Sequence, residues 1–177
     1  TGMRTSMQVL KKRLALDTED RNNVIIDRTV KEIDRINHLI SDLLGYSKPS
    51  VHEPKPILVT DSVNGVLSLL ESDLIQRSIQ VDVMNEENDV SFFIDPNHFH
   101  QILLNIIKNA MDAVMDAGLI KINIRRSSID NRGEIEIVDN GVGIESKDIE
   151  KIFDPFFTLK NDGTGLGMSV GHELVHR

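Results

Sequence analysis

Three of the five prolines of this 177-residue chain, Pro49, Pro54 and Pro56, fall within eight residues. Proline fixes its own φ and has no backbone N–H to donate, so neither a helix nor a central strand is expected to cross this stretch. We therefore predict a stiff linker over residues 49–56, between one module at 1–48 and another at 57–177. Because the chain begins and stops within helical patterns, we expect both modules to be truncated at their outer ends.

The first module has the apolar spacing of two helices. Apolar side chains recur at three- and four-residue steps over residues 3–14, and again over a second predicted helix at about 21–46. A polar break at residues 17–20 separates the two patterns. Such a hairpin cannot cover both of its apolar faces, so we predict that it packs on a second copy as a dimeric four-helix bundle. The alternative is that it packs on the rest of this chain.

The second module alternates strands and helices. Strands are predicted at residues 57–59, 79–84, 90–94, 119–126 and 134–138, with a turn at 85–89 between the second and third. One helix is predicted at 61–76, capped by Thr60 or Asp61, and a longer one from Asp95 to about residue 117, closed by a left-handed Gly118. The predicted fold class is α+β, an α/β sandwich in which helices cover one face of a mixed or antiparallel sheet.

Charge and composition exclude several classes of protein. The 28 acidic and 20 basic side chains leave a net charge of −8, which argues against general affinity for nucleic acid or anionic lipid. The absence of cysteine excludes a disulfide framework, a zinc ribbon and a thiol nucleophile. No apolar run approaches the ~20 residues that span a bilayer. We predict no nucleic-acid partner, no membrane contact by this fragment, and a cytoplasmic location, with a membrane anchor in the parent protein left open.

Glycine is the most informative residue type, because five of the 11 glycines form two clusters in the last quarter of the chain. The first cluster, residues 139–144, follows the last predicted strand and reads Asp-Asn-Gly-Val-Gly-Ile. Glycine permits a sharp turn and the close approach of a ligand, and Asp139 could accept a hydrogen bond from an exocyclic amine. The alternative is a hairpin turn at Asn140-Gly141.

The second cluster, residues 162–168, reads Asp-Gly-Thr-Gly-Leu-Gly-Met and opens a new predicted helix. Such a loop aims backbone N–H groups and a helix N-terminus at phosphate oxygens. It lacks the Gly-Lys-Ser/Thr ending of a Walker loop, and its spacing differs from that of the dinucleotide fingerprint. A flexible loop without a ligand is the alternative.

A third element lies on the long predicted helix. Asn105, Asn109 and Asp112 repeat at helical spacing along one face of an otherwise apolar segment. Burying an unpaired amide costs about 1–3 kcal/mol, so such groups need partners. Their oxygens suit a hard cation such as Mg²⁺, and a neutral amide does not repel phosphates. The alternative is a helix whose solvent-exposed face carries these residues.

Together these elements resemble the N, G1 and G2 boxes of the histidine kinase ATP-binding domain, in the order of that family. Residues 152–160, Ile-Phe-Asp-Pro-Phe-Phe-Thr-Leu-Lys, resemble its F box. Residues 33–36 and 42–49 resemble the second helix of its dimerisation domain, so the resemblance covers nearly the whole chain. It implies the ATPase fold of that family, and ATP and Mg²⁺ as cofactors.

The resemblance also implies roles for individual residues. Asn109 would hold Mg²⁺, Asn105 would face the phosphates, and Asp139 would bind the adenine amino group. The phenylalanines of the F box would brace a lid, in which Thr158 and Lys160 would sense the γ-phosphate. The residues expected to contact the nucleotide are Asn105, Lys108, Asn109, Asp112, Asp139, Gly141, Gly143, Ile144, Phe156, Thr158, Gly163, Thr164, Gly165, Leu166 and Gly167. Gly141 and Gly143 would make room for the base.

The phosphoacceptor histidine of the family has no match in this chain, since none of the six histidines lies on the first predicted helix. Residues 1–3 fit the last three positions of the family's H box, with Gly2 where proline is usual. This register puts the acceptor about four residues before Thr1. Thr1 itself would occupy the polar position that orients water for dephosphorylation of the partner, so Thr1 and Lys160 are the predicted catalytic residues.

The predicted function is that of a sensor histidine kinase core. It would bind Mg²⁺-ATP, phosphorylate a histidine on the dimerisation helix and pass the phosphoryl group to an aspartate of a response-regulator receiver domain. The alternatives are a nucleotide-binding regulator or phosphatase without kinase activity, and another ATPase of the same superfamily, such as a topoisomerase, mismatch-repair or chaperone ATPase.

Overall fold

The computed structural model divides the chain into two compact units. The first unit combines Thr1–Lys48 with Phe156–Leu166, and the second combines Pro49–Pro155 with Gly167–Arg177. The residues that the structure describes are 2–14, 22–30, 32–33, 36, 53–86, 90–115, 117–127, 132–160 and 163–176. Each unit is described by itself.

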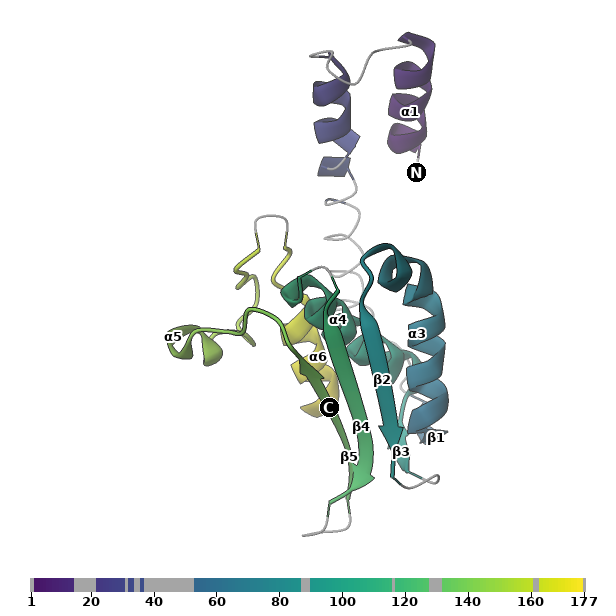
Figure 1. Ribbon diagram of the computed structural model, residues 1–177, viewed down its shortest axis with the longest axis vertical. Helices are drawn as coiled ribbons and strands as arrows, with labels where there is room; N and C mark the ends of the chain where they lie inside the picture. The colour runs from purple at the N-terminus through teal and green to yellow at the C-terminus, as the bar shows by residue number, and fades with distance from the viewer. Residues whose placement is uncertain are drawn as a thin grey trace. The chain divides into compact units, whose positions relative to one another are not determined.

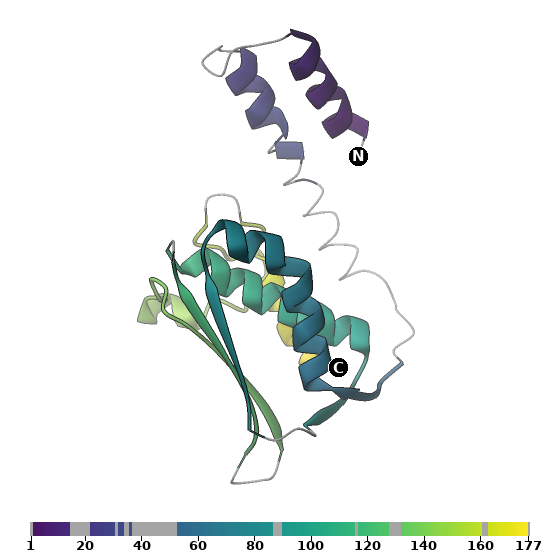
Figure 2. The ribbon, with the colours of Figure 1, turned by 45° about the vertical axis from the view of Figure 1, so that its right-hand side comes forward.

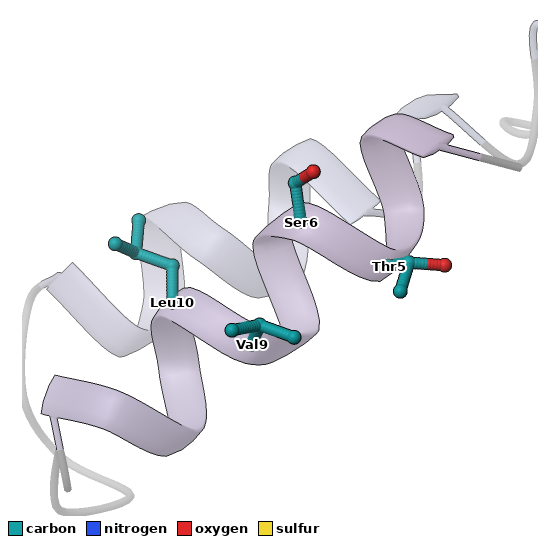
Figure 3. A pocket seen from close by; sticks show the side chains of 4 residues that line it. All are labelled: Thr5, Ser6, Val9 and Leu10. Atoms are coloured by element: carbon teal, nitrogen blue, oxygen red, sulfur yellow. The ribbon is translucent and has the colours of Figure 1, made fainter.

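Helix α1 spans Gly2–Leu14 in the first unit, and residues 22–30 are also helical. An ion pair joins Lys11 Nζ to Asp27 Oδ1 at 2.7 Å, and Ile26 is buried. Val9 and Leu10 remain 44% and 45% exposed, and Figure 3 shows them beside Thr5 and Ser6 on α1. Much of the second predicted helix, at 21–46, lies outside the described residues, so pairing into a dimeric bundle stays a prediction.

The second unit contains two sheets and, among the described residues, four helices (Figure 1). Its strands are β1 (Lys55–Leu58), β2 (Gln80–Asn85), β3 (Ser91–Ile94), β4 (Leu119–Arg126) and β5 (Gly133–Asp139). Its helices are α3 (Val59–Gln76), α4 (Pro96–Ala113), the short α5 (Ser146–Ile149) and α6 (Gly167–His176). None of the helices within the described residues is both long and apolar enough to cross a membrane.

The larger sheet has the strand order β2-β4-β5, in which β2 and β4 are parallel and β4 and β5 are antiparallel. The sheet is therefore mixed, which is one of the two forms that the sequence predicts. The strands on either side of residues 85–89 do not pair, because β3 joins β1 in a separate antiparallel sheet. Strand periodicity identifies such segments, whereas their partners depend on contacts far along the chain.

Among the described residues, helices pack on one face of the larger sheet, and Figure 2 shows α3 and α4 together on that side. Alternate residues of β4 point to this face, where Ile120, Ile122 and Ile124 are fully buried. They join Val63 and Leu103, from α3 and α4, in one apolar core. The opposite face carries charged pairs such as Arg125 with Glu134, whose side chains lie 3.1 Å apart. The sheet therefore has one buried and one exposed face.

Helix α3 begins earlier than the sequence predicts, and its capping prediction is wrong. Its N-cap is Leu58, which makes no capping hydrogen bond through its side chain. The backbone N–H of Val59 instead donates to the carbonyl of Val90 at 3.0 Å, and Thr60 Oγ1 accepts from Asn85 Nδ2 at 2.9 Å. Because β1 starts at Lys55, the last two residues of the predicted linker belong to a strand.

Helix α4 ends earlier than predicted, at Ala113. Val114 has an extended backbone, and the left-handed residue is Ala117, with φ 61°, rather than Gly118. Gly118 has a different reason to be glycine, since a Cβ there would overlap the side chain of Val114. The packing of this connection, rather than a helix cap, explains the glycine.

The start of α4 is fastened by Asp95, as the Asp-Pro pair predicts. Asp95 is 8% exposed, and its carboxylate accepts hydrogen bonds from the backbone N–H groups of Glu53, Asn97 and His98. The bond from Glu53, followed by those from Asn97 and His98, lowers the pKa of Asp95 below its ordinary value, although burial opposes this. One side chain thus caps α4 and ties the segment before β1 to it.

We expect the substitution Asp95→Ala to lower the free energy of unfolding by about 1–2 kcal/mol, because three backbone donors lose their acceptor. Urea unfolding at pH 7 measures the difference, with the exposed Asp73→Ala in α3 as control. Because the folded-state pKa is lowered, the contribution of Asp95 is complete above its ordinary value of 3.8 and is lost as the pH falls through the lowered value. Equal stability of the two variants at pH 7 would contradict this assignment.

Candidate functional site

Four predicted site residues lie along one edge of α4. Asn105 and Asn109 are half-buried, whereas Lys108 and Asp112 are exposed. Asp112 is already paired, since its Oδ1 lies 3.0 Å from a guanidinium nitrogen of Arg77. The amide nitrogen of Asn105 donates to the backbone carbonyl of Gly167 at 3.1 Å. Helix α4 therefore presents two amides on the side where α6 begins.

Asp139 is the last residue of β5, opposite Ile120 of β4. Since Ile120 belongs to the buried face, Asp139 lies on the same side of the sheet as the helices. Its Oδ1 accepts a hydrogen bond from the backbone N–H of Gly141 at 2.9 Å. The carboxylate is thus held in one orientation at the end of the strand, and its side chain remains exposed.

Gly141 is needed for contact with α4. A Cβ at this position would overlap the backbone carbonyl of Ala113, the last residue of α4. The next residue, Val142, donates its backbone N–H to the same carbonyl at 3.1 Å. The resemblance implies that Gly141 makes room for a base, and in the structure Gly141 lies against the end of α4. Gly143 follows in this loop, with a φ of 72° and open space where a Cβ would be. The next residue, Ile144, is exposed.

Two hydrogen bonds therefore join three distant segments of the second unit around α4. The bond from Val142 to Ala113 attaches the loop after β5 to the C-terminal end of α4. The bond from Asn105 to Gly167 attaches the start of α6 to the middle of α4. The segments are those that the sequence singles out as the asparagine helix and the two glycine clusters. These hydrogen bonds thus connect the elements that carry four of the predicted site residues: Asn105, Asn109, Asp139 and Gly167.

The remaining predicted residues belong to the segment Phe156–Leu166 of the first unit. Its two ends are tied by a hydrogen bond from the N–H of Phe156 to the carbonyl of Gly165 at 3.0 Å, where both residues have positive φ, 69° and 68°. A Cβ on Gly165 would overlap the backbone of Phe156, so this closure requires glycine. The segment forms a loop closed at its base.

Side-chain hydroxyls organise the interior of this loop. Thr158 Oγ1 accepts from the backbone N–H of Lys160 at 3.1 Å, and Thr164 Oγ1 accepts from that of Leu166 at 3.4 Å. Gly163 donates its N–H to the carbonyl of Lys160 at 3.3 Å. The loop residues are held by one another, so Thr158, Lys160, Gly163, Thr164, Gly165 and Leu166 are placed within their own unit. Thr1, the other predicted catalytic residue, lies outside the described residues.

The side-chain oxygens of Asp139 and Asn109, both in the second unit, suit a nucleotide bound with a hard cation. Asp139 offers a carboxylate oxygen for an amino group, and Asn109 offers an amide oxygen, a type of donor that Mg²⁺ accepts while keeping waters and phosphate oxygens as further ligands. Among the described residues, no group of three or more His, Cys, Asp and Glu side chains is arranged to hold a metal ion.

Two residues of this region are not among the predicted site residues. Asn140 reaches the start of β4, where its Oδ1 accepts from the N–H of Leu119 at 2.8 Å. Arg77, just after α3, donates to Asp112 and to the carbonyl of Met111. Asn140 belongs to the first glycine cluster, where the sequence also allows a hairpin turn at Asn140-Gly141. Nothing near Arg77 in the sequence indicates its distant partners.

Comparisons with known proteins identify the same region. Residues 94–177 match the family described as histidine kinase-, DNA gyrase B-, and HSP90-like ATPase. The chain is 35% identical over 147 residues to sensor histidine kinase ZraS of Salmonella typhimurium, covering 83% of this chain and 31% of that protein. It is 33% identical over 178 residues to signal transduction histidine-protein kinase AtoS of Escherichia coli, covering 99% of this chain and 28% of that protein.

Solved structures agree with these relatives. The catalytic domain of histidine kinase ThkA superposes with a TM-score of 0.64 at 27% identity, over 70% of this chain and 80% of that one. A second structure, of ThkA in complex with response regulator protein TrrA, gives a TM-score of 0.68 at 25% identity, over 87% and 46%. The chain spans about a third of the length of its curated relatives. Together these similarities support a sensor histidine kinase ATPase core, in which residues 94–177 match the ATPase family.

Proposed function

We propose that this chain binds Mg²⁺-ATP and belongs to a kinase that transfers the γ-phosphoryl group to a histidine and then to an aspartate of a response regulator. The observation that carries the proposal is the pair of hydrogen bonds, from Val142 to Ala113 and from Asn105 to Gly167, that attach both glycine clusters to α4. Through them the carboxylate of Asp139 and the amides of α4 belong to one framework. We assign residues 1–48 to dimerisation and 57–177 to catalysis, with the linker between them.

Asp139 would bind the adenine. Its Oδ1 is engaged by Gly141, and none of the described residues donates to Oδ2, which can accept a hydrogen bond from the exocyclic amino group. A site built to bind a donor on the substrate discriminates strongly against an analogue that lacks it. Guanine carries a carbonyl oxygen at the corresponding ring position, so the carboxylate would disfavour it.

The phosphates would lie towards Gly167 and the start of α6, where helix N–H groups and the dipole favour negative charge. One N–H of the Asn105 amide is used by Gly167, and the other can face a phosphate oxygen. Lys108 lies one residue before Asn109 on α4 and would add positive charge at the edge of the nucleotide site. Thr158 and Lys160 are the proposed contacts of the loop with the γ-phosphate.

Asn109 would supply an amide oxygen to Mg²⁺. With ATP, such an ion would neutralise charge on the phosphates. Because the amide is neutral, Asn109 adds no repulsion towards the triphosphate, whereas a carboxylate at this position would. The contribution of α4 is to hold this oxygen at a fixed place relative to Asp139.

The acceptor would be an imidazole nitrogen on the dimerisation helix, upstream of Thr1. It forms a bond to the γ-phosphorus as the bond to the leaving ADP oxygen breaks, a reaction that proteins accelerate mainly by positioning and charge neutralisation. The exposed Val9 and Leu10 on α1 support an apolar seam that a second copy covers. The structure of ThkA with TrrA supports a response-regulator receiver domain as the next acceptor.

We expect Asp139→Asn to weaken ATP binding about tenfold or more, because an amide at this position no longer guarantees an acceptor for the adenine amine. Isothermal titration with Mg²⁺-ATP measures the dissociation constant. Asp73→Asn, the same change of charge at an exposed position of α3, serves as control. The assignment of Asp139 fails if both variants bind ATP as the unaltered chain does.

The substitution Asn109→Leu tests the metal ligand. In the unaltered chain we expect ATP to bind more tightly with Mg²⁺ than with excess EDTA, and in the variant we expect this ratio to fall towards one, because the amide oxygen is lost. Asn97→Leu, at an exposed position in the first turn of α4, is the matched control. An unchanged ratio in Asn109→Leu would remove Asn109 from the metal site.

Kinase activity is tested on a protein extended upstream of Thr1 and incubated with γ-labelled ATP. We expect labelled phosphate that is labile in acid and stable in base, as expected for a phosphorus–nitrogen bond, and its transfer to a receiver domain. Sedimentation of the same protein should give the mass of a dimer, against 19.9 kDa for one 177-residue chain. ATP binding without such a product would favour the regulator or phosphatase over the kinase.

A further inference from the structure

Asn140 replaces a backbone hydrogen bond of the sheet with one from its side chain. Ile120 and Asp139 are the last paired residues of β4 and β5, so Leu119 and Asn140 stand at the next position of the antiparallel ladder. At a hydrogen-bonded position each residue donates to the backbone carbonyl of the other. Asn140 donates to the carbonyl of Leu119 at 3.2 Å, but Leu119 donates to the side-chain Oδ1 of Asn140 at 2.8 Å.

This exchange releases the main chain from the sheet at a defined residue. Since the side-chain oxygen satisfies Leu119, the backbone after Asn140 is free to turn, and the next two residues reach α4. Gly141 lies against the carbonyl of Ala113, and Val142 donates to it at 3.1 Å. Asn140 therefore connects the start of β4 to a loop whose other end is attached to α4.

An ordinary turn would not require this bond. In an Asx turn the side chain accepts from the backbone two residues further on, and Asp139 makes that bond, to Gly141 at 2.9 Å. The bond of Asn140 instead spans 21 residues of sequence. It joins two strands, and its neighbours in the chain are the carboxylate that we assign to adenine and the glycine that contacts α4.

We propose that Asn140 is a positioning residue for adenine recognition: its Oδ1 fixes the point at which β5 leaves the sheet and so holds the Asp139 carboxylate in register with α4. This inference rests on the proposed function, because it assumes that Asp139 binds the base. Asn140 itself needs no contact with the nucleotide. Its role is to make the carboxylate selective for an amino group over a carbonyl.

The test compares Asn140→Ala, which removes the acceptor, with Asn140→Asp, which retains an oxygen at the same position. Asn97→Ala, an exposed asparagine of α4, is the control. Titration with Mg²⁺-ATP and Mg²⁺-GTP gives the two dissociation constants of the whole 177-residue chain, and hydrogen exchange reports the amide of Leu119 directly. For Asn140→Ala we expect roughly five- to tenfold weaker ATP binding with little change for GTP, and faster exchange at Leu119. For Asn140→Asp we expect both properties to be largely restored.

Four results would overturn the proposal, the last of them together with the proposed function. One is an unchanged preference for ATP over GTP in Asn140→Ala despite faster exchange at Leu119, which would make the bond dispensable for recognition. Another is an equal loss of ATP and GTP binding together with a lower unfolding midpoint, which would make Asn140 structural only. Failure of Asn140→Asp to restore the preference would also contradict the role of Oδ1. Absence of ATP binding by the unaltered chain would overturn the proposed function, and this inference with it.

Discussion

The hydrogen bond from Val142 to the carbonyl of Ala113 is the interaction on which the arrangement of the site depends. The last carbonyls of a helix have no partner within the helix, so a donor from elsewhere is needed where they are not exposed to water. The loop after β5 supplies this donor, and it approaches closely enough only because residue 141 is glycine. Asp139 and α4 are thereby held together through the backbone of this loop.

Much of the second unit could be predicted because its signals are local. The apolar alternation of β4, the Asp95-Pro96 start of α4 and the glycine clusters each depend on residues close in sequence. The mixed sheet with helices on one face follows from these elements and from the need to bury their apolar sides. The asparagines of α4 could be recognised for the same reason, since helical spacing alone puts them on one face.

The features that the sequence misses are set by contacts between distant segments. The first N–H of α3 is satisfied by the carbonyl of Val90, so no Ser, Thr or Asp cap is needed there. Gly141 lies against the carbonyl of Ala113 at the end of α4, a neighbour that its place in the sequence does not indicate. In each case the residue type can be read from the sequence, but the contact that explains it forms only in the folded chain. The pairing of β3 with β1 is of the same kind.

The position at which α4 ends belongs to the site as much as its asparagines do. Asn105 acts through a side chain, because its own backbone groups are used within the helix, whereas Ala113 acts through a carbonyl that is spare only because the helix stops there. Had α4 continued to residue 117, as its apolar pattern predicts, that carbonyl would accept an N–H from the helix itself and Val142 would lose its partner. The extended backbone of Val114, packed against Gly118, prevents this. A packing constraint between a helix and the following strand therefore sets the geometry of the loop that carries Asp139.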